Sequence, residues 1–391
     1  MTRIHEQARA GGGVRLLVLG AGHYPHAQQS KPKVPKLADI GSAARSAVDF
    51  ATRALTDWRV LFRKPIASVD LLINDAGHPD GIDFACDGIA ATAVDAPTLA
   101  NILAARTRWL TDVGPNDILI FYCCGHGIWM PSIGRTFLAS DFGVDPESVW
   151  PGAVAIDRFI EGMGDKAARE QWLMFDCCAN LPPQALRNSH PAANALVEAT
   201  EGLRKAMIDV HGPLAQAVIA SASQGAQAFG RANGRSRFMD VFIEACEGPG
   251  FRDQDQNGRW QTSLQGLEAA MATYRFRVAA FEDRDYYTFA RLTMSDAEEA
   301  PVLMSRDVPA PCTLLVTSEP PIKLKQGTLD IFHGGARIDG QAPGPNADER
   351  FRRNVDPYAT YKVEASWPAA LAYPPQSQQR VAVPPLVEVK F

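Results

Sequence analysis

The sequence predicts an α/β fold, in which a doubly wound, mostly parallel sheet is flanked by helices and followed by a small all-β, sandwich-like domain. Apolar runs of strand length alternate with amphipathic segments of helix length from residue 14 onward. Toward the carboxyl end, 13 of the 28 prolines fall between Pro301 and Pro385, and this density excludes helices and favours turns and edge strands. We therefore place one domain at residues 1–300 and a second at residues 308–391.

The elements of the first domain follow from the periodicity of the apolar residues. The run VRLLVLGAG is apolar almost throughout, as expected of a strand covered on both faces, and the segment after it repeats apolar residues at helical spacing. Read in this way, the chain has strands at 14–22, 68–75, 117–125, 171–178 and 217–224, helices at 38–58, 98–113, 156–169, 191–209, 237–247 and 263–279, and a hairpin around 135–143. In the second domain, the runs CTLLVTSE, GTLDIFHGGARIDG, TYKVEASW and PPLVEVKF predict short strands of a sandwich.

Composition excludes several classes of function. The chain has 391 residues, of which 46% are hydrophobic and 21% charged, with a formal net charge of −5. No basic run is present that would neutralise phosphates, which argues against nucleic acid as a partner. We find neither a signal-peptide pattern nor a stretch of about 18 apolar residues, and we expect a cytoplasmic protein without a membrane partner.

The cysteines raise the main chemical question, because two adjacent pairs occur in DILIFYCCGHGIWM (117–130) and WLMFDCCAN (172–180). The chain has seven cysteines, and adjacent ones cannot bridge each other without strain, which argues against a disulfide framework. Zinc sites use spacings such as C-x-x-C, so these pairs fit a metal site poorly. Buried cysteines that pack as small apolar residues remain a good account of Cys123 and Cys177.

Strand geometry divides the two pairs. Both lie at the carboxyl ends of predicted parallel strands, where functional groups of open α/β sheets gather. Because side chains alternate along a strand, Cys124 shares a face with His126, and Cys178 shares one with Asp176. A buried carboxylate must be paired or used. A histidine opposite a cysteine at this edge of a sheet indicates nucleophilic chemistry.

These segments resemble the caspase and metacaspase superfamily. FYCCGHG is similar to its histidine strand, commonly Y-S-G-H-G, and FDCCAN to its nucleophile strand, commonly D-S-C-H-S-G; 178 − 126 gives a separation of 52 residues, close to the roughly 50 residues typical of caspases. LLVLGAGHYP followed by the helix that carries Asp49, VIASASQGAQAFG and GRSRFMDVFIEAC are similar to further segments of the family. The resemblance implies a caspase-like fold for the first domain.

The resemblance also implies a function, that of a cysteine endopeptidase acting on protein or peptide substrates. Cys178 takes the position of the nucleophile and His126 that of the histidine, and the oxyanion would be held by the backbone N–H groups of Gly127 and Cys178. Asp176 matches the aspartate that binds arginine or lysine at P1 in metacaspases. The residues expected to contact substrate are Asp176, Cys124, Ser221 and Ser223. No cofactor is required, and regulated cell death or defence in bacteria is the associated biological role.

Two departures from the family pattern keep an alternative open. The residues after the nucleophile are Ala179 and Asn180, where metacaspases usually have H-S-G, and the loop after strand 217–224 has no acidic residue to reinforce a basic pocket. The alternative is a catalytically inactive caspase-like module that binds partners. The C-terminal β domain is a candidate for binding a protein partner in either case.

A weaker motif, DQDQNGRW, resembles a calcium loop. Asp253, Asp255 and Asn257 stand at loop positions 1, 3 and 5, but position 12, normally a bidentate glutamate, is Leu264. A solvated turn is therefore favoured over bound calcium, and calcium stays a candidate regulator only.

Overall fold

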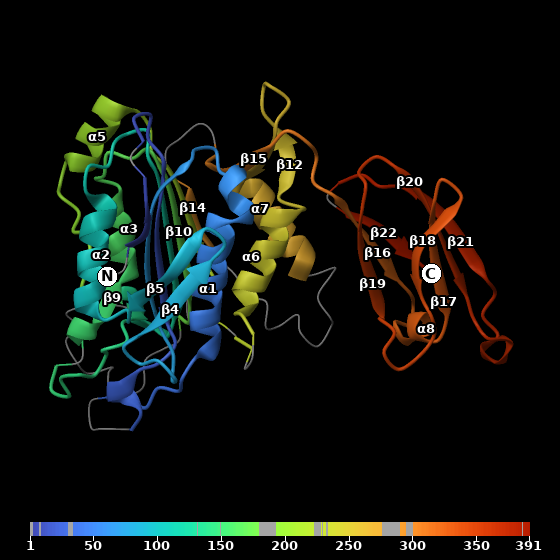
Figure 1. Cartoon of the computed structure of the whole chain (residues 1–391), viewed down its shortest axis with the longest axis horizontal. Coiled ribbons are helices and arrows are strands. Elements are labelled where there is room, and N and C mark those ends of the chain that lie inside the picture. Colours follow the sequence, from blue (N-terminus) through green and yellow to red (C-terminus); the bar gives the residue numbers. More distant parts are fainter. Residues whose placement is uncertain are drawn as a thin grey trace. The chain divides into compact units, whose positions relative to one another are not determined.

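The computed structural model describes residues 3–7, 9–29, 34–130, 132–148, 150–179, 193–222, 228, 230–231, 234–275, 290–294, 300–384 and 386–391. The chain forms two compact units (Figure 1). The first comprises Met1–Asp240 with Asp285–Leu303, and the second Val241–Arg284 with Met304–Phe391. The boundary between them falls inside helix α6, Arg237–Glu247.

A seven-stranded sheet forms the centre of the first unit. Its strand order is β1-β3-β2-β6-β10-β11-β14, in which the five inner strands run parallel and the two edge strands antiparallel. The predicted α/β class with a mostly parallel sheet is confirmed. The strands are β1 (Arg3–Glu6), β2 (Val14–Ala21), β3 (Ile66–Asn74), β6 (Ile118–Gly125), β10 (Glu170–Cys177), β11 (Ala215–Ala220) and β14 (Ala290–Met294).

Helices cover both faces of this sheet. Figure 1 shows α1 (Gly41–Leu55) on one face and α2 (Leu99–Leu110), α3 (Ile156–Met163) and α5 (Leu203–His211) on the other. The second face holds a large core in which Trp109 of α2 and Phe159 of α3 pack around Phe121 of β6. Every residue of β3 and β6 is buried, as the largely apolar runs predict, and β3 buries Ser68, Asp70 and Asn74 as well.

Two predicted helices differ from those observed. The helix expected at 156–169 ends at Met163, and the one expected at 191–209 begins only at Leu203. Residues 193–197 instead form a β-bridge between Asn194 and Val154 and pack their apolar side chains into the hydrophobic core. These side chains are therefore buried without a helix. Tertiary contacts override local helix propensity in this segment.

The first unit also contains short hairpins and short 3-10 turns. The hairpin expected around 135–143 lies at Gly127–Leu138, where β7 (Gly127–Met130) pairs with β8 (Gly134–Leu138), which in turn pairs with β9 (Ala153–Ala155). A further hairpin joins β4 (Gly81–Cys86) to β5 (Ile89–Asp95). Short 3-10 turns occur at Pro25–Ala27, Asp57–Val60 and Trp150–Gly152.

The second unit contains a β-sandwich. One sheet has the order β19-β16-β22 and the other β18-β17-β20-β21, and side chains from both sheets share one hydrophobic core. The strands are β16 (Cys312–Thr317), β17 (Thr328–His333), β18 (Ala336–Gln341), β19 (Arg350–Val355), β20 (Thr360–Ser366), β21 (Gln376–Val381) and β22 (Leu386–Lys390), with α8 at Ile322–Lys325 and a 3-10 turn at Ala369–Leu371.

The remaining elements of the second unit precede the sandwich in the sequence. They are the hairpin of β12 (Phe251–Gln254) and β13 (Trp260–Ser263), followed by α7 (Leu264–Thr273). A third strand, β15 (Val302–Arg306), belongs to the same small sheet and crosses the boundary between the units. Across the described ranges, no helix combines the length and apolarity needed to cross a bilayer.

Candidate active site

The register of two central strands brings the histidine and the second cysteine pair together. Parallel strands β6 and β10 place Asp176 opposite Cys124 and Cys177 opposite Gly125, so that His126 and Cys178 directly follow the last paired positions. The backbones stay close beyond the strands, because a Cβ added at Gly127 would lie 2.3 Å from the carbonyl oxygen of Cys178. Only glycine allows this approach. The two motifs meet at the carboxyl edge of the sheet.

The predicted division of the cysteines between the two faces is confirmed. On the α1 face, the Tyr122 hydroxyl donates to Asp176 Oδ2 at 2.9 Å, and the Tyr122 ring stacks on Phe50 of α1. Cys123 and Cys177 instead belong to the core on the face of α2 and α3. All seven cysteines are described, and all are free thiols.

The imidazole of His126 is held by a backbone carbonyl. Its Nε2 lies 2.8 Å from the oxygen of Ala38, just ahead of α1. A carbonyl only accepts hydrogen bonds, so Nε2 carries a proton and the lone pair of the neutral ring is on Nδ1. Burial lowers the pKa of His126, while the hydrogen bond to Ala38 and the charge of Asp39 oppose that shift. The neutral ring, with a basic Nδ1, is therefore favoured at neutral pH.

Tyr24 positions the backbone of His126. Its buried hydroxyl accepts the N–H of His126 at 2.8 Å, and the two rings lie 5.0 Å apart. Next to Ala38, the carboxylate of Asp39 is 2.7 Å from Nδ1 of His23. Neither Tyr24 nor Ala38 was predicted from the sequence. The signal available was only their place: Tyr24 follows β2 at the carboxyl edge of the sheet, and Ala38 precedes α1.

The thiol of Cys178 is half-buried and contacts one residue of a later segment. The N–H of Ala228 donates to Cys178 Sγ at 3.3 Å, and the thiol lies 3.6 Å from the Ala228 carbonyl oxygen. Burial raises the pKa of Cys178, and the Ala228 N–H partly offsets this by stabilising the thiolate. Among the described hydrogen bonds, none joins Cys178 to His126. The two pKa shifts favour a neutral thiol and a neutral imidazole at neutral pH.

The state of the thiol predicts its reactivity toward iodoacetamide. Since alkylation consumes the thiolate, the rate at Cys178 should keep rising with pH beyond the ordinary cysteine pKa of about 8.5. The measurement is the pH dependence of alkylation by mass spectrometry in a Cys86→Ser background, because Cys86 is the other cysteine that is not fully buried. A midpoint below the ordinary value would show instead that the thiolate is stabilised by an ion pair.

The described residues that were expected to contact substrate, Asp176, Cys124 and Ser221, lie together in the interior and not at an open surface. The Asp176 carboxylate is 2% exposed, and the hydroxyls of Tyr122 and Ser236 both donate to its Oδ2. Burial raises its pKa, and hydrogen bonds from Ser236, Tyr122, Cys124 and Ser221 oppose the shift. Cys124 and Ser221 are also buried, with the Ser221 hydroxyl 3.3 Å from the carbonyl oxygen of Cys177. Ser223 and Asn180 lie outside the described residues.

The calcium-loop residues form the turn of the β12–β13 hairpin. Asp255 Oδ1 accepts the N–H groups of Asn257 and Arg259, both at 2.9 Å, and Asp253 Oδ2 accepts the hydroxyl of Ser263 at 2.9 Å. The Asp255 carboxylate thus caps the backbone of the turn, and the Asp253 carboxylate binds a neighbouring side chain. Within the described part of the chain, no group of three or more histidine, cysteine or acidic residues is arranged to hold a metal ion.

Comparisons with known proteins do not assign the chain to a family. No family model matches the chain, and no curated protein matches it. Among solved structures, the chain is similar to a structural-genomics protein of Geobacter sulfurreducens, with 13% sequence identity and a TM-score of 0.40. That alignment covers 76% of this chain and 94% of the other.

Proposed function

We propose that the chain is a caspase-like cysteine endopeptidase in which Cys178 is the nucleophile and His126 the general base. The observation that carries the proposal is the close approach of the two strand ends, where the backbone at Gly127 lies against the carbonyl of Cys178. A thiol and a histidine with a free Nδ1 lone pair at one sheet edge are the two groups that acyl transfer needs. The proposal includes a role for this peptidase in bacterial defence or regulated cell death.

The reaction follows from these two groups. His126 Nδ1 takes the proton of the Cys178 thiol as Sγ attacks the carbonyl carbon of the scissile peptide bond, and the negative charge moves to the carbonyl oxygen. The N–H groups of Gly127 and Cys178 are proposed to bind that oxygen. Collapse of the intermediate breaks the C–N bond, and the amine leaves with the proton from Nδ1. Water then hydrolyses the thioester with His126 again as base, which restores the thiol.

The hydrogen bond from His126 Nε2 to the carbonyl of Ala38 supports this assignment of roles. A histidine base is most effective when a third group fixes its tautomer and orientation. Here that group is a backbone carbonyl, which an alanine substitution cannot remove. Burial keeps the base neutral at working pH, so it is ready to accept the thiol proton.

A preference for arginine or lysine at P1 is the second part of the proposal and depends on Asp176. Because Asp176 is buried and Ser236 and Tyr122 already donate to its Oδ2, a basic side chain would have to enter the interior and either use the other carboxylate oxygen or displace one of these hydroxyls. One library experiment therefore answers two separate questions: whether peptide bonds are hydrolysed, and after which residue types.

The test is cleavage of a proteome-derived peptide library by the purified full-length chain. We expect the wild type to produce new peptide termini and His126→Ala to lose at least about a thousandfold in rate, because the thiol then has no base. Cleavage after arginine and lysine would support the basic pocket, and cleavage after other residues would reject it. Equal cleavage by the wild type and His126→Ala would refute the dyad. A folded wild type that cleaves nothing would favour the inactive binding module.

A further inference from the structure

Backbone contacts join the described residues of the segment that begins at the Cys178 contact. It runs from Ala228 to Ser236, and its described residues are 228, 230, 231 and 234–236. Gly230 bridges Ser236 in antiparallel fashion, the N–H of Arg231 donates to the Arg235 carbonyl at 3.2 Å, and that of Gly234 donates to the Arg231 carbonyl at 3.3 Å. These contacts hold Gly230 and Arg231 against Arg235 and Ser236, an arrangement that we call the turn. Ala228, which contacts the thiol, precedes Gly230 by two residues in the chain.

Ser236 fixes the far end of the turn to three elements. Its N–H donates to Ser46 Oγ of α1 at 2.9 Å, and its hydroxyl donates to Asp176 of β10. The same hydroxyl accepts the N–H of Met239 at 3.0 Å and so caps the start of α6. The turn also packs directly on α1, since a Cβ at Gly230 would lie 2.0 Å from Ser42 Oγ.

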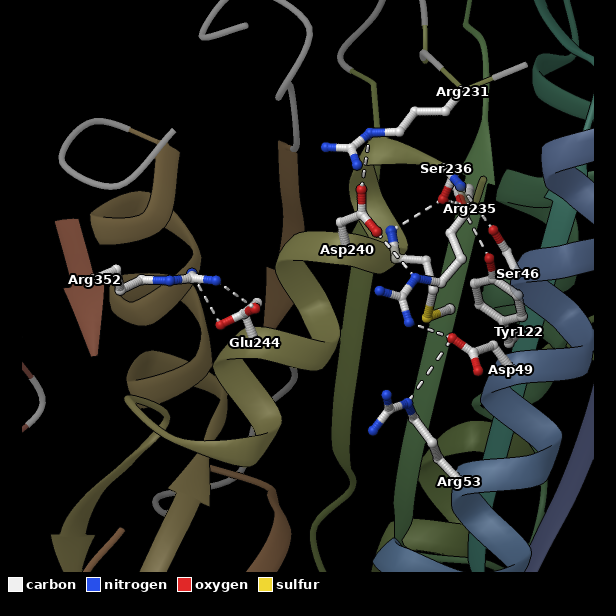
Figure 2. Close-up of polar contacts among 12 residues, drawn as sticks. Ser46, Asp49, Arg53, Tyr122, Arg231, Arg235, Ser236, Asp240, Glu244 and Arg352 are labelled. Atoms are coloured by element: carbon white, nitrogen blue, oxygen red, sulfur yellow. Dashed lines mark hydrogen bonds and ion pairs between the residues drawn. The ribbon is translucent and has the colours of Figure 1, made fainter. Parts of the chain in front are cut away.

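Arg235 adds an ionic clamp, which we define as Arg235 with Asp49 and Asp240. Figure 2 shows the Arg235 guanidinium between Asp49 of α1 and Asp240 in the first turn of α6. Its Nε lies 2.9 Å from Asp240 Oδ1, and its Nη1 contacts Asp49 Oδ2. The Arg235 side chain is 33% exposed and that of Asp240 10%. The planar fork of arginine suits two carboxylates, which a point charge such as lysine would not.

We propose that this ionic clamp positions the N–H of Ala228 against Cys178 Sγ and so sets the reactivity of the thiol. The inference deepens the proposed function, because it assigns a positioning residue, Arg235, to the same nucleophile. The clamp holds the turn between α1 and the first turn of α6, and the donor that stabilises the thiolate lies two residues before the turn in the chain. Without the clamp the donor is displaced, and the thiolate loses a charge-assisted hydrogen bond.

The test compares Arg235→Gln with Arg53→Gln. Arg53 lies 3.9 Å from the same Asp49 oxygen but on α1 itself, so its substitution removes an equal charge without touching the turn. The readout is the rate of iodoacetamide alkylation of Cys178 against pH, in the Cys86→Ser background. Neither substitution replaces any of the other titratable groups near the thiol, which are Asp176, Cys177 and His126. We expect Arg235→Gln to react about tenfold more slowly below the thiol pKa, and Arg53→Gln to match the wild type.

The dependence of the alkylation rate on salt concentration tests the same inference in the wild type. The clamp borders a cavity of about 460 Å³ and is about one-third exposed at Arg235 and Asp49, so 1 M NaCl should screen it. We expect salt to slow alkylation of the wild type toward the Arg235→Gln rate, while the Arg235→Gln rate stays unchanged. Iodoacetamide is neutral, so its encounter with the thiol does not itself depend on ionic strength.

Several outcomes would overturn the inference. A folded Arg235→Gln protein with the wild-type thiol pKa, or with a lower one, would show that the clamp does not position the donor. If Arg235→Gln does not fold, Asp49→Asn removes one arm only, and the wild-type alkylation profile in that variant would equally reject the clamp. Alkylation needs no substrate, so a clamp effect in a protein that cleaves no peptide would refute the proposed peptidase while leaving the clamp intact.

Discussion

Cys178→Ala is expected to abolish peptide hydrolysis, with a loss in kcat of at least about a thousandfold. The thiol is the only group at the sheet edge proposed to form a bond to substrate, and alanine removes it without adding volume. Its folding cost should be small, about 1 kcal/mol, because it removes only the weak contacts of the thiol with the N–H and carbonyl oxygen of Ala228. Initial rates on peptides found in the library, with thermal unfolding alongside, measure both effects.

Cys177→Ala is the matched control for that prediction. Cys177 is one residue away, has the same chemistry and is 5% exposed, but it faces the core on the α2 and α3 side of the sheet. Its substitution opens a small cavity worth about 1 kcal/mol and should change the hydrolysis rate only a few-fold. Loss of activity in Cys177→Ala equal to that in Cys178→Ala would mean that the wrong neighbour has been assigned.

Asp176→Ala is expected to have the largest effect on stability. It leaves the buried hydroxyls of Tyr122 and Ser236 without their acceptor and removes the anchor of the turn at Ser236. We expect a loss of about 3 kcal/mol in the free energy of unfolding, measured by chemical denaturation. Asp176→Asn is the control, because both hydroxyls donate to the same carboxylate oxygen and one amide oxygen can replace it. An alanine variant as stable as the asparagine variant would show that these hydrogen bonds contribute little.

The pH dependence of stability gives an independent check on Asp176. Burial raises its pKa in the folded protein, so the folded state binds a proton more tightly than the unfolded state does. The contribution of this group to stability is therefore greatest below the unfolded pKa and is lost as the pH rises through the folded pKa. Asp176→Asn does not titrate at this position. The wild type should therefore lose stability relative to this variant as the pH rises over that window.

The α/β part of the fold could be predicted because its strands are buried on both faces. Runs such as residues 14–22 and 117–125 leave little alternative to parallel inner strands, and strand alternation was enough to separate Cys123 from Cys124. The edge strands could not be predicted. β1 and β14 read as ordinary polar or mixed sequence, and only their pairing with β3 and β11 makes them strands.

The candidate site was predicted only where side-chain identity carried the signal. His126, Cys178 and Asp176 stand out as residue types at strand ends, but the groups that hold them are mostly backbone or distant in sequence. The Ala38 carbonyl and the Ala228 N–H could belong to any residue type. The hydrogen bond between Ser236 and Asp176 spans 60 residues, and nothing in the local pattern marks it. Such partners are fixed by tertiary structure.

The most direct test of the central claim is to trap the acyl-enzyme. The wild type, Cys178→Ala and Cys177→Ala would each be incubated with a peptidyl p-nitrophenyl ester, quenched in acid, and analysed as intact protein and after tryptic digestion by mass spectrometry. If Cys178 attacks the carbonyl, the wild type and Cys177→Ala will carry one acyl group on residue 178, and Cys178→Ala will carry none. An acyl group on Cys177, or the same degree of acylation in Cys178→Ala, would contradict the assignment.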